Sequence, residues 1–263
     1  MAWRLLPGLL LAQFALVWLR VCLPHPLFGD AGWPEGLLLL LAAGGTLAGQ
    51  ARQTPGQNVA LASIIILSLA GLALAVGART GIPLGPIAGS GRSPNQVLRW
   101  LPWAAALWLL ALLTSRGVAR LILRPRRASF TYGFQVLGLT VLLVLLFNSA
   151  FQPFASSFGH CWPWQGGSLA GDWRGTPCVG LGAQAVTALF ILIFATPCLI
   201  NKQRVSLPAQ GHPLVIWVLA NLLFATAAIT RHLWGAAALA ALSAVAAALL
   251  GVRGAAAPEV KPA

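Results

Sequence analysis

Two amide side chains near the middle of the chain have the spacing of a polar site. Asn148 and Gln152 are one helical turn apart, near the end of a long apolar stretch. Amides can hold a water molecule or a hydroxyl group, but they cannot act as strong acids or bases. The alternative is interhelical hydrogen bonding, which is common between membrane helices. The pair therefore predicts a binding function or a packing function, and not proton transfer by itself.

The segment that follows carries the side chains that could complete a reaction. His160 is a candidate proton donor, although an interfacial polar role is the favoured interpretation, and Asp172 is a candidate acid that could instead pair with Arg174. Three tryptophans lie in the same region: Trp162, Trp164 and Trp173. An aromatic belt at head-group level is the favoured interpretation of these tryptophans. The alternative is a pocket for an elongated apolar ligand.

A third region is rich in glycine and proline and precedes the amides. Residues 78–96 contain Gly81, Pro83, Gly85 and Pro86. Repeated proline and glycine fix a tight path that is not helical. The pattern predicts either an ordered loop with a binding role or a plain surface loop that interrupts two helices.

The composition requires these sites to lie in a membrane protein. Of the 263 residues, 58% are hydrophobic and 8% are charged, whereas about 25% of a soluble domain is charged. The net charge of +13 fits topology signals and anionic lipid head groups better than nucleic acid, because the basic residues lie between apolar runs. None of the four cysteines forms a CxxC motif, so we predict no metal site; Cys161 and Cys178 could form a disulfide, but two free thiols are favoured.

Apolar runs long enough to cross a bilayer recur along the whole chain. They predict an all-α, polytopic transmembrane bundle with about eight spans and a single domain, residues 1–253, followed by a disordered cytoplasmic tail, residues 254–263. The expected spans are Leu5–Leu23, Ala31–Gly49, Asn58–Val76, Val97–Leu113, Tyr132–Phe154, Val179–Ile200, Pro213–Thr230 and Leu233–Val252. The second is the least regular, because Pro34 and Glu35 fall near its start.

Basic residues predict the orientation of these spans. Eleven Lys and Arg residues fall on the side of the two termini and six on the other side, so both termini should be cytoplasmic, in a cell inner membrane. The run Arg116–Arg127 is the strongest determinant, and a topology anchor is its favoured role. No acidic residue lies deep in a span, which argues against an ion-coupled transporter. Small-solute transport stays a further alternative.

Taken in order, several short motifs resemble the carotenoid biosynthesis membrane family, which includes carotenoid hydratases. The matching positions, between about Ala60 and Ile200, are Gly81-Ile82-Pro83-Leu84-Gly85-Pro86, then Pro102 and Trp108, then Asn148 and Gln152-Pro153, then Trp162-Pro163-Trp164, and last Gly175-Thr176-Pro177 with Gly180 and Gln184. The chain departs from the family pattern at three places. Asn148 and Gln152 stand at two acidic positions, Ile87-Ala88-Gly89 replaces aromatic residues, and the Asn and Trp of the last motif are not kept.

The resemblance implies addition of water to the terminal double bond of an isoprenoid chain. An acid must protonate the alkene, and tryptophan faces can stabilise the resulting cation. Asp172 and His160 are then the catalytic candidates, with Asp30 or Glu35 as weaker substitutes. The substrate-binding candidates are Asn148, Gln152, Trp162, Trp164, Trp173, Gly81, Pro83, Gly85 and Pro86. The resemblance implies membrane lipid and an apolar isoprenoid ligand as partners, with no cofactor and no nucleic acid. A diverged member that only binds an isoprenoid or a partner helix is the alternative.

Overall fold

The chain folds into a bundle of long helices in a computed structural model that describes residues 2–23, 33–80, 94–157, 172–173, 176–200 and 211–257. The helices are α1 (Ala2–Cys22), α2 (Trp33–Ala51), α3 (Gly56–Thr80), α4 (Pro94–Ile122), α5 (Tyr132–Ser157), α6 (Cys178–Leu199), α7 (His212–Thr230) and α8 (Trp234–Ala256). A short 3-10 turn, η2 (Arg124–Arg126), follows α4. Two short antiparallel strands, β1 (Asp172–Trp173) and β2 (Thr176–Pro177), precede α6.

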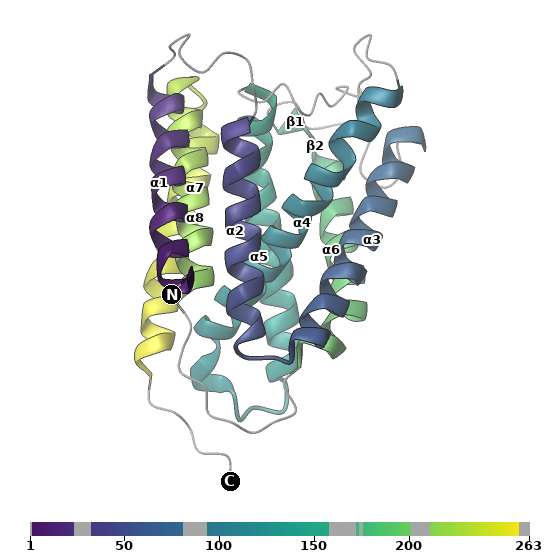
Figure 1. Ribbon diagram of the computed structural model, residues 1–263, viewed down its shortest axis with the longest axis vertical. Helices are drawn as coiled ribbons and strands as arrows, with labels where there is room; N and C mark the ends of the chain where they lie inside the picture. Colours follow the sequence, from purple (N-terminus) through teal and green to yellow (C-terminus); the bar gives the residue numbers. More distant parts are fainter. Residues whose placement is uncertain are drawn as a thin grey trace.

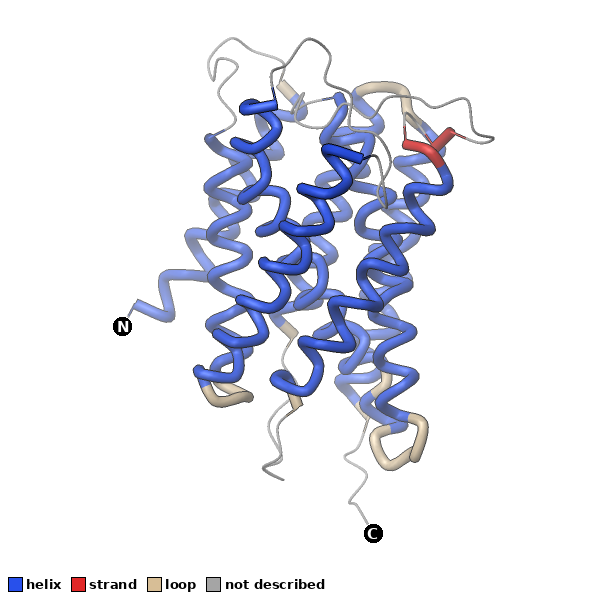
Figure 2. Tube along the Cα trace, turned by 90° about the vertical axis from the view of Figure 1, so that its right-hand side faces the viewer, coloured by secondary structure: helices blue, strands red, loops and turns tan. Residues whose placement is uncertain are grey.

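The helices run alternately up and down between two ends of the bundle (Figure 1). In that view, α1 and α2 meet near the upper end, as do α7 and α8, and the turns from α2 to α3 and from α4 to α5 lie at the lower end. The beginning of α1 and the end of α8 point toward the lower end (Figures 1 and 2). An up-and-down helical bundle is therefore confirmed.

Six of the helices are long and apolar enough to cross a membrane: Gly56–Thr80, Leu101–Ile122, Tyr132–Ala155, Gly180–Leu199, His212–Thr230 and Trp234–Ala256. In α1 the apolar stretch is shorter, Leu6–Cys22. Helix α2 begins with Pro34 and Glu35 in its first turn and packs between α1 and α4. The chain is thus an integral membrane protein, and its described residues form six candidate spans and two further helices in the same bundle.

Helix α4 is the centre of the bundle and separates two buried clusters. It packs against α2, α3, α5, α7 and α8. On one side, the first cluster joins α4 and α5 to α1, α2, α7 and α8, through residues such as Phe147 and Trp217. On the other side, the second cluster joins α4 and α5 to α3 and α6, through residues such as Val144 and Ala188. Helix α5 therefore faces two different environments.

Helix α4 ends later than the hydropathy pattern indicates. The expected span ends at Leu113, but the helix continues to Ile122, so Arg116 and Arg120 lie inside it. Arg116 is only 6% exposed, so the run Arg116–Arg127 begins inside the bundle, and its role as a topology anchor stays a prediction. A hydropathy window ends at the first charged residue, but α4 continues because Val118, Ala119 and Leu121 still pack in the core.

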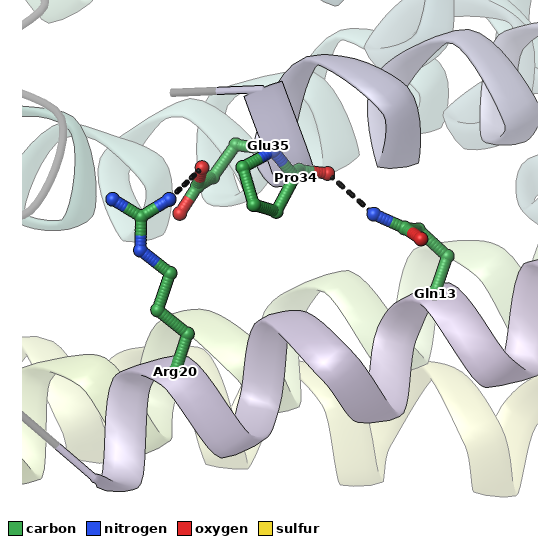
Figure 3. Close-up of polar contacts among 4 residues, drawn as sticks. All are labelled: Gln13, Arg20, Pro34 and Glu35. Atoms are coloured by element: carbon green, nitrogen blue, oxygen red, sulfur yellow. Dashed lines mark hydrogen bonds and ion pairs between the residues drawn. The ribbon is translucent and has the colours of Figure 1, made fainter. Parts of the chain in front are cut away.

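Polar contacts near the upper end fix α1 to its neighbours (Figure 3). The Arg20 guanidinium forms an ion pair with Glu35 at 2.8 Å, and Gln13 Nε2 donates to the carbonyl of Pro34 at 2.8 Å. Gln13 and Arg20 are two helical turns apart, so both reach the first turn of α2 from the same face of α1. On another side, Trp18 Nε1 donates to Thr226 Oγ1 of α7 at 2.9 Å.

Candidate functional site

The polar face of α5 provides the clearest candidate site among the described residues. Thr140, Val144, Asn148 and Gln152 follow each other at intervals of four residues, and all four are buried. Val144 belongs to the cluster that α5 shares with α3, α4 and α6. Because residues four apart lie above one another on a helix, Asn148 lies one turn above Val144, toward the upper end. The row thus directs amides into the bundle and not toward lipid.

A third amide approaches the same level from α6. Gln184 lies one turn above Ala188, which shares the buried cluster of Val144. The start of α5 at Tyr132 and the end of α6 at Leu199 are both neighbours of Arg116, so Asn148 and Gln184, 16 and 15 residues from these ends, lie at a similar depth. Gln184 is 2% exposed, and its buried Oε1 has no hydrogen-bond partner among the described residues. An unpartnered acceptor at this depth costs free energy, about 1–3 kcal/mol, unless a hydroxyl or water donates to it.

Helix α4 adds a buried aromatic side chain to the same cluster. Trp108 is buried, and it belongs to the same cluster as Val144 and Ala188. It lies one turn above Leu112 of that cluster, and α4, like α6, runs from the upper to the lower end (Figure 1). Helices α4, α5 and α6, which carry Trp108, Asn148 with Gln152, and Gln184, therefore all border this buried cluster.

The catalytic candidates are described only in part. Asp172 and Trp173 form β1, whose backbone pairs Asp172 with Pro177 and Trp173 with Thr176. Pro177 directly precedes α6, so the backbone of Asp172 lies beside the start of this helix, at its upper end. The other candidates lie outside the described residues: Gly81, Pro83, Gly85, Pro86, His160, Trp162 and Trp164. The contacts expected between the tryptophans, Asp172 and Asn148 therefore stay predictions.

Glu35, one of the weaker candidates for the missing acid, forms an ion pair away from the three amides. Its carboxylate pairs with Arg20, between α1 and α2 and away from the α5–α6 interface. Asp30, the other substitute, lies outside the described residues. Around the three amides, the described side chains include no carboxylate. Amides can orient water or bind a hydroxyl, and they cannot supply the proton that an alkene requires.

A second face of α5 carries an aromatic cluster that was not predicted from the sequence. Phe224 of α7 contacts Phe147 and Phe154 with ring centroids 5.3 Å apart in each case, and Phe151 at 5.6 Å. Phe147 also contacts Trp217 at 6.5 Å, whose Nε1 donates to Ser115 of α4 at 3.1 Å. The spacing of Phe147, Phe151 and Phe154 on one helical face could have indicated this cluster, but not its partner α7.

The described residues contain neither a candidate metal site nor a disulfide. In the described part of the chain, no group of three His, Cys, Asp or Glu side chains could hold a metal ion. Cys22 and Cys198 are free thiols. Cys161 and the side chain of Cys178 lie outside what is described, so the question of a disulfide between them stays open.

Comparison with protein families gives one match. The family model described as carotenoid biosynthesis protein matches residues 35–247. The matched segment begins at Glu35 and covers most of the chain, including all of α3 to α7. No curated protein and no solved structure matches the chain.

Proposed function

Because the chain belongs to the carotenoid biosynthesis protein family, we propose that it binds an isoprenoid chain in the upper half of the bundle, with the amides of α5 and α6 holding a polar end. The observation that carries this proposal is the buried Oε1 of Gln184, which has no partner, at the level of Asn148. A ligand hydroxyl or a bound water could donate to this oxygen. The apolar remainder of the ligand would lie against residues such as Trp108.

Analysis of co-purified lipids tests the binding proposal. The protein is purified in mild detergent from cells that make carotenoids, and its organic extract is analysed by liquid chromatography and mass spectrometry. We expect an isoprenoid in stoichiometric amount relative to protein, and enriched over the whole-membrane extract. An extract with the same isoprenoid content as an unrelated membrane protein purified in parallel would contradict the proposal.

A second candidate function is hydration of the terminal double bond, and the position of β1 favours it. The backbone of Asp172 is held beside the start of α6, the helix that carries Gln184. In this reaction the carboxylic acid of Asp172 gives its proton to the less substituted carbon of the terminal double bond, which leaves a tertiary cation on the other carbon. A water oriented by the amides attacks the cation, and its extra proton returns to the carboxylate. The sum is addition of one water, with Asp172 regenerated.

Pigment profiling separates the two candidates. Cells with and without the gene, in a strain that makes carotenoids, are compared by mass spectrometry. Hydration predicts that the deletion removes hydroxylated products and that their dehydrated precursors accumulate, and Asp172→Asn should reproduce the deletion. An unchanged profile would overturn catalysis, and binding would then be the remaining function of the site.

A further inference from the structure

A buried guanidinium lies near the lower end of the bundle, far from the amides. Arg116 of α4 is 6% exposed. Its Nη2 donates to the carbonyl of Leu199, the last residue of α6, at 3.3 Å. Its Nη1 is also buried and has no hydrogen-bond partner in the described part of the chain. Burying an ionised group is costly unless it is paired and its hydrogen bonds are satisfied.

The charges around Arg116 increase this cost. Arg120 lies one turn below on α4 and is an electrostatic neighbour of Arg116, and like charges at this spacing destabilise a helix. Glu35 is the one carboxylate among the described side chains, and it pairs with Arg20 at the upper end. No described carboxylate therefore neutralises Arg116 or Arg120.

Two groups of α5 complement this arrangement. Tyr132, the first residue of α5, is half-buried and is also an electrostatic neighbour of Arg116. Its phenol can donate one hydrogen bond. The first turn of any helix presents backbone N–H groups that lack intrahelical acceptors, and these attract anions. One region thus contains two cations, the buried Arg116 and the half-buried Arg120, together with the phenol of Tyr132 and the start of α5.

We propose that Arg116 and Arg120 bind the phosphate of an anionic phospholipid between α4, α5 and α6. Arg116 lies six residues above the end of α4, or about 9 Å along the helix axis, a depth that a head group at the membrane surface can reach. Guanidinium groups bind phosphate through paired N–H donors. The bound phosphate would satisfy Nη1 and neutralise the repulsion between the two arginines.

The simpler alternative is that Arg116 only caps α6. A basic side chain near a helix C-terminus stabilises the last carbonyl groups, and the bond to Leu199 does this. That role uses Nη2 and leaves Nη1 and the charge of Arg120 unexplained. The two roles differ in one measurable way, since only the proposed site responds to added anion.

Thermal unfolding of the delipidated protein in detergent tests the proposal. Dioleoylphosphatidylglycerol is added to one sample, dioleoylphosphatidylcholine to a second and inorganic phosphate to a third. The phosphatidylglycerol should raise Tm by about 5 °C at a lipid concentration of ~100 times Kd, and the phosphatidylcholine by much less. A rise with inorganic phosphate that equals the rise with phosphatidylglycerol would support the anion site and identify a soluble source.

Four variants test whether the rise in Tm comes from lipid binding at Arg116. Arg116→Gln should abolish it, whereas Arg253→Gln, which changes an exposed arginine of α8 at the same end, should keep it. If Arg116→Gln does not fold, Arg120→Gln should still lower the shift. A shift that persists in Arg116→Gln would overturn the proposal. A fall in the Tm of the lipid-free Glu259→Gln variant well below that of wild type would also overturn it, because the tail carboxylate would then be the natural counter-charge of Arg116.

Discussion

The two faces of α5 differ in how completely their side chains are satisfied within the protein. On one face, Phe147, Phe151 and Phe154 pack around Phe224, and nothing in this contact requires another molecule. On the other face, Asn148 and Gln152 are buried at the level of Gln184, whose Oε1 has no partner. Helix association in lipid gains from close packing and from interhelical hydrogen bonds. The aromatic face therefore accounts for stability, and the amide face is where a ligand is expected.

The largest effect should come from removing the centre of the aromatic face. Phe224→Ala deletes three ring contacts and leaves a cavity, so the free energy of unfolding should fall by about 3–5 kcal/mol. Thermal unfolding in detergent, followed by size-exclusion chromatography, measures this loss. Phe130→Ala is the control, because Phe130 is 98% exposed in the turn before α5 and should change little. Equal stability of the two variants would contradict the structural role of this face.

Close helix packing on the aromatic side gives the next effect. A Cβ atom added at Gly117 of α4 would lie 2.5 Å from the Pro213 ring of α7, and this ring cannot move aside by rotation. Gly117→Val should therefore destabilise the protein by about 1–3 kcal/mol through overpacking. Gly138→Val on α5 is the matched control, since a Cβ atom at Gly138 would meet no atom within 4 Å. If Gly138→Val lowers Tm as much as Gly117→Val, helix propensity and not packing explains the loss.

The amide face should respond in the opposite direction. Gln184→Leu replaces an unpartnered buried amide by an apolar group of similar size, which should leave the free energy of unfolding unchanged or raise it by about 1 kcal/mol. The same variant should lose the co-purified isoprenoid. Thermal unfolding and lipid analysis of one preparation measure both effects. A large loss of stability would show instead that Gln184 is a packing residue.

The smallest effect concerns the ion pair that joins α1 to α2. Arg20 and Glu35 are 18% and 28% exposed, so their coupling energy in a double-mutant cycle with Arg20→Gln and Glu35→Gln should be about 0.2–1 kcal/mol. Raising the salt concentration should reduce it, because exposed charges are screened. Neither single variant should alter isoprenoid content. A loss of isoprenoid would extend the functional region beyond α4, α5 and α6.

The sequence predicts much of this fold because hydropathy and helix length determine it directly. The spans around Tyr132–Phe154 and Val179–Ile200 match α5 and α6 within a few residues. The end of α4 could not be predicted, since the burial of Arg116 depends on α6, whose Leu199 carbonyl accepts its hydrogen bond. This partner of Arg116 lies on another helix, so a hydropathy window along α4 does not include it.

The candidate site shows the same division between local and tertiary information. The polar row on α5 could be predicted from Asn148 and Gln152 at a spacing of four residues. That Gln184 lies at the depth of Asn148 depends on how α5 and α6 pack, and the sequence did not indicate it. Phe224 was missed, because its contacts with α5 join residues seventy or more positions apart.

The most direct test compares the isoprenoid bound to wild-type protein with that bound to Asn148→Leu and Thr140→Val. Both variants remove a buried polar group from the same row of α5, but the Thr140 hydroxyl already donates to Val136 of its own helix at 2.6 Å. We expect Asn148→Leu to fold and to lose most of the bound isoprenoid, and Thr140→Val to keep it. Equal isoprenoid content in Asn148→Leu and wild type would contradict a ligand site on the amide face.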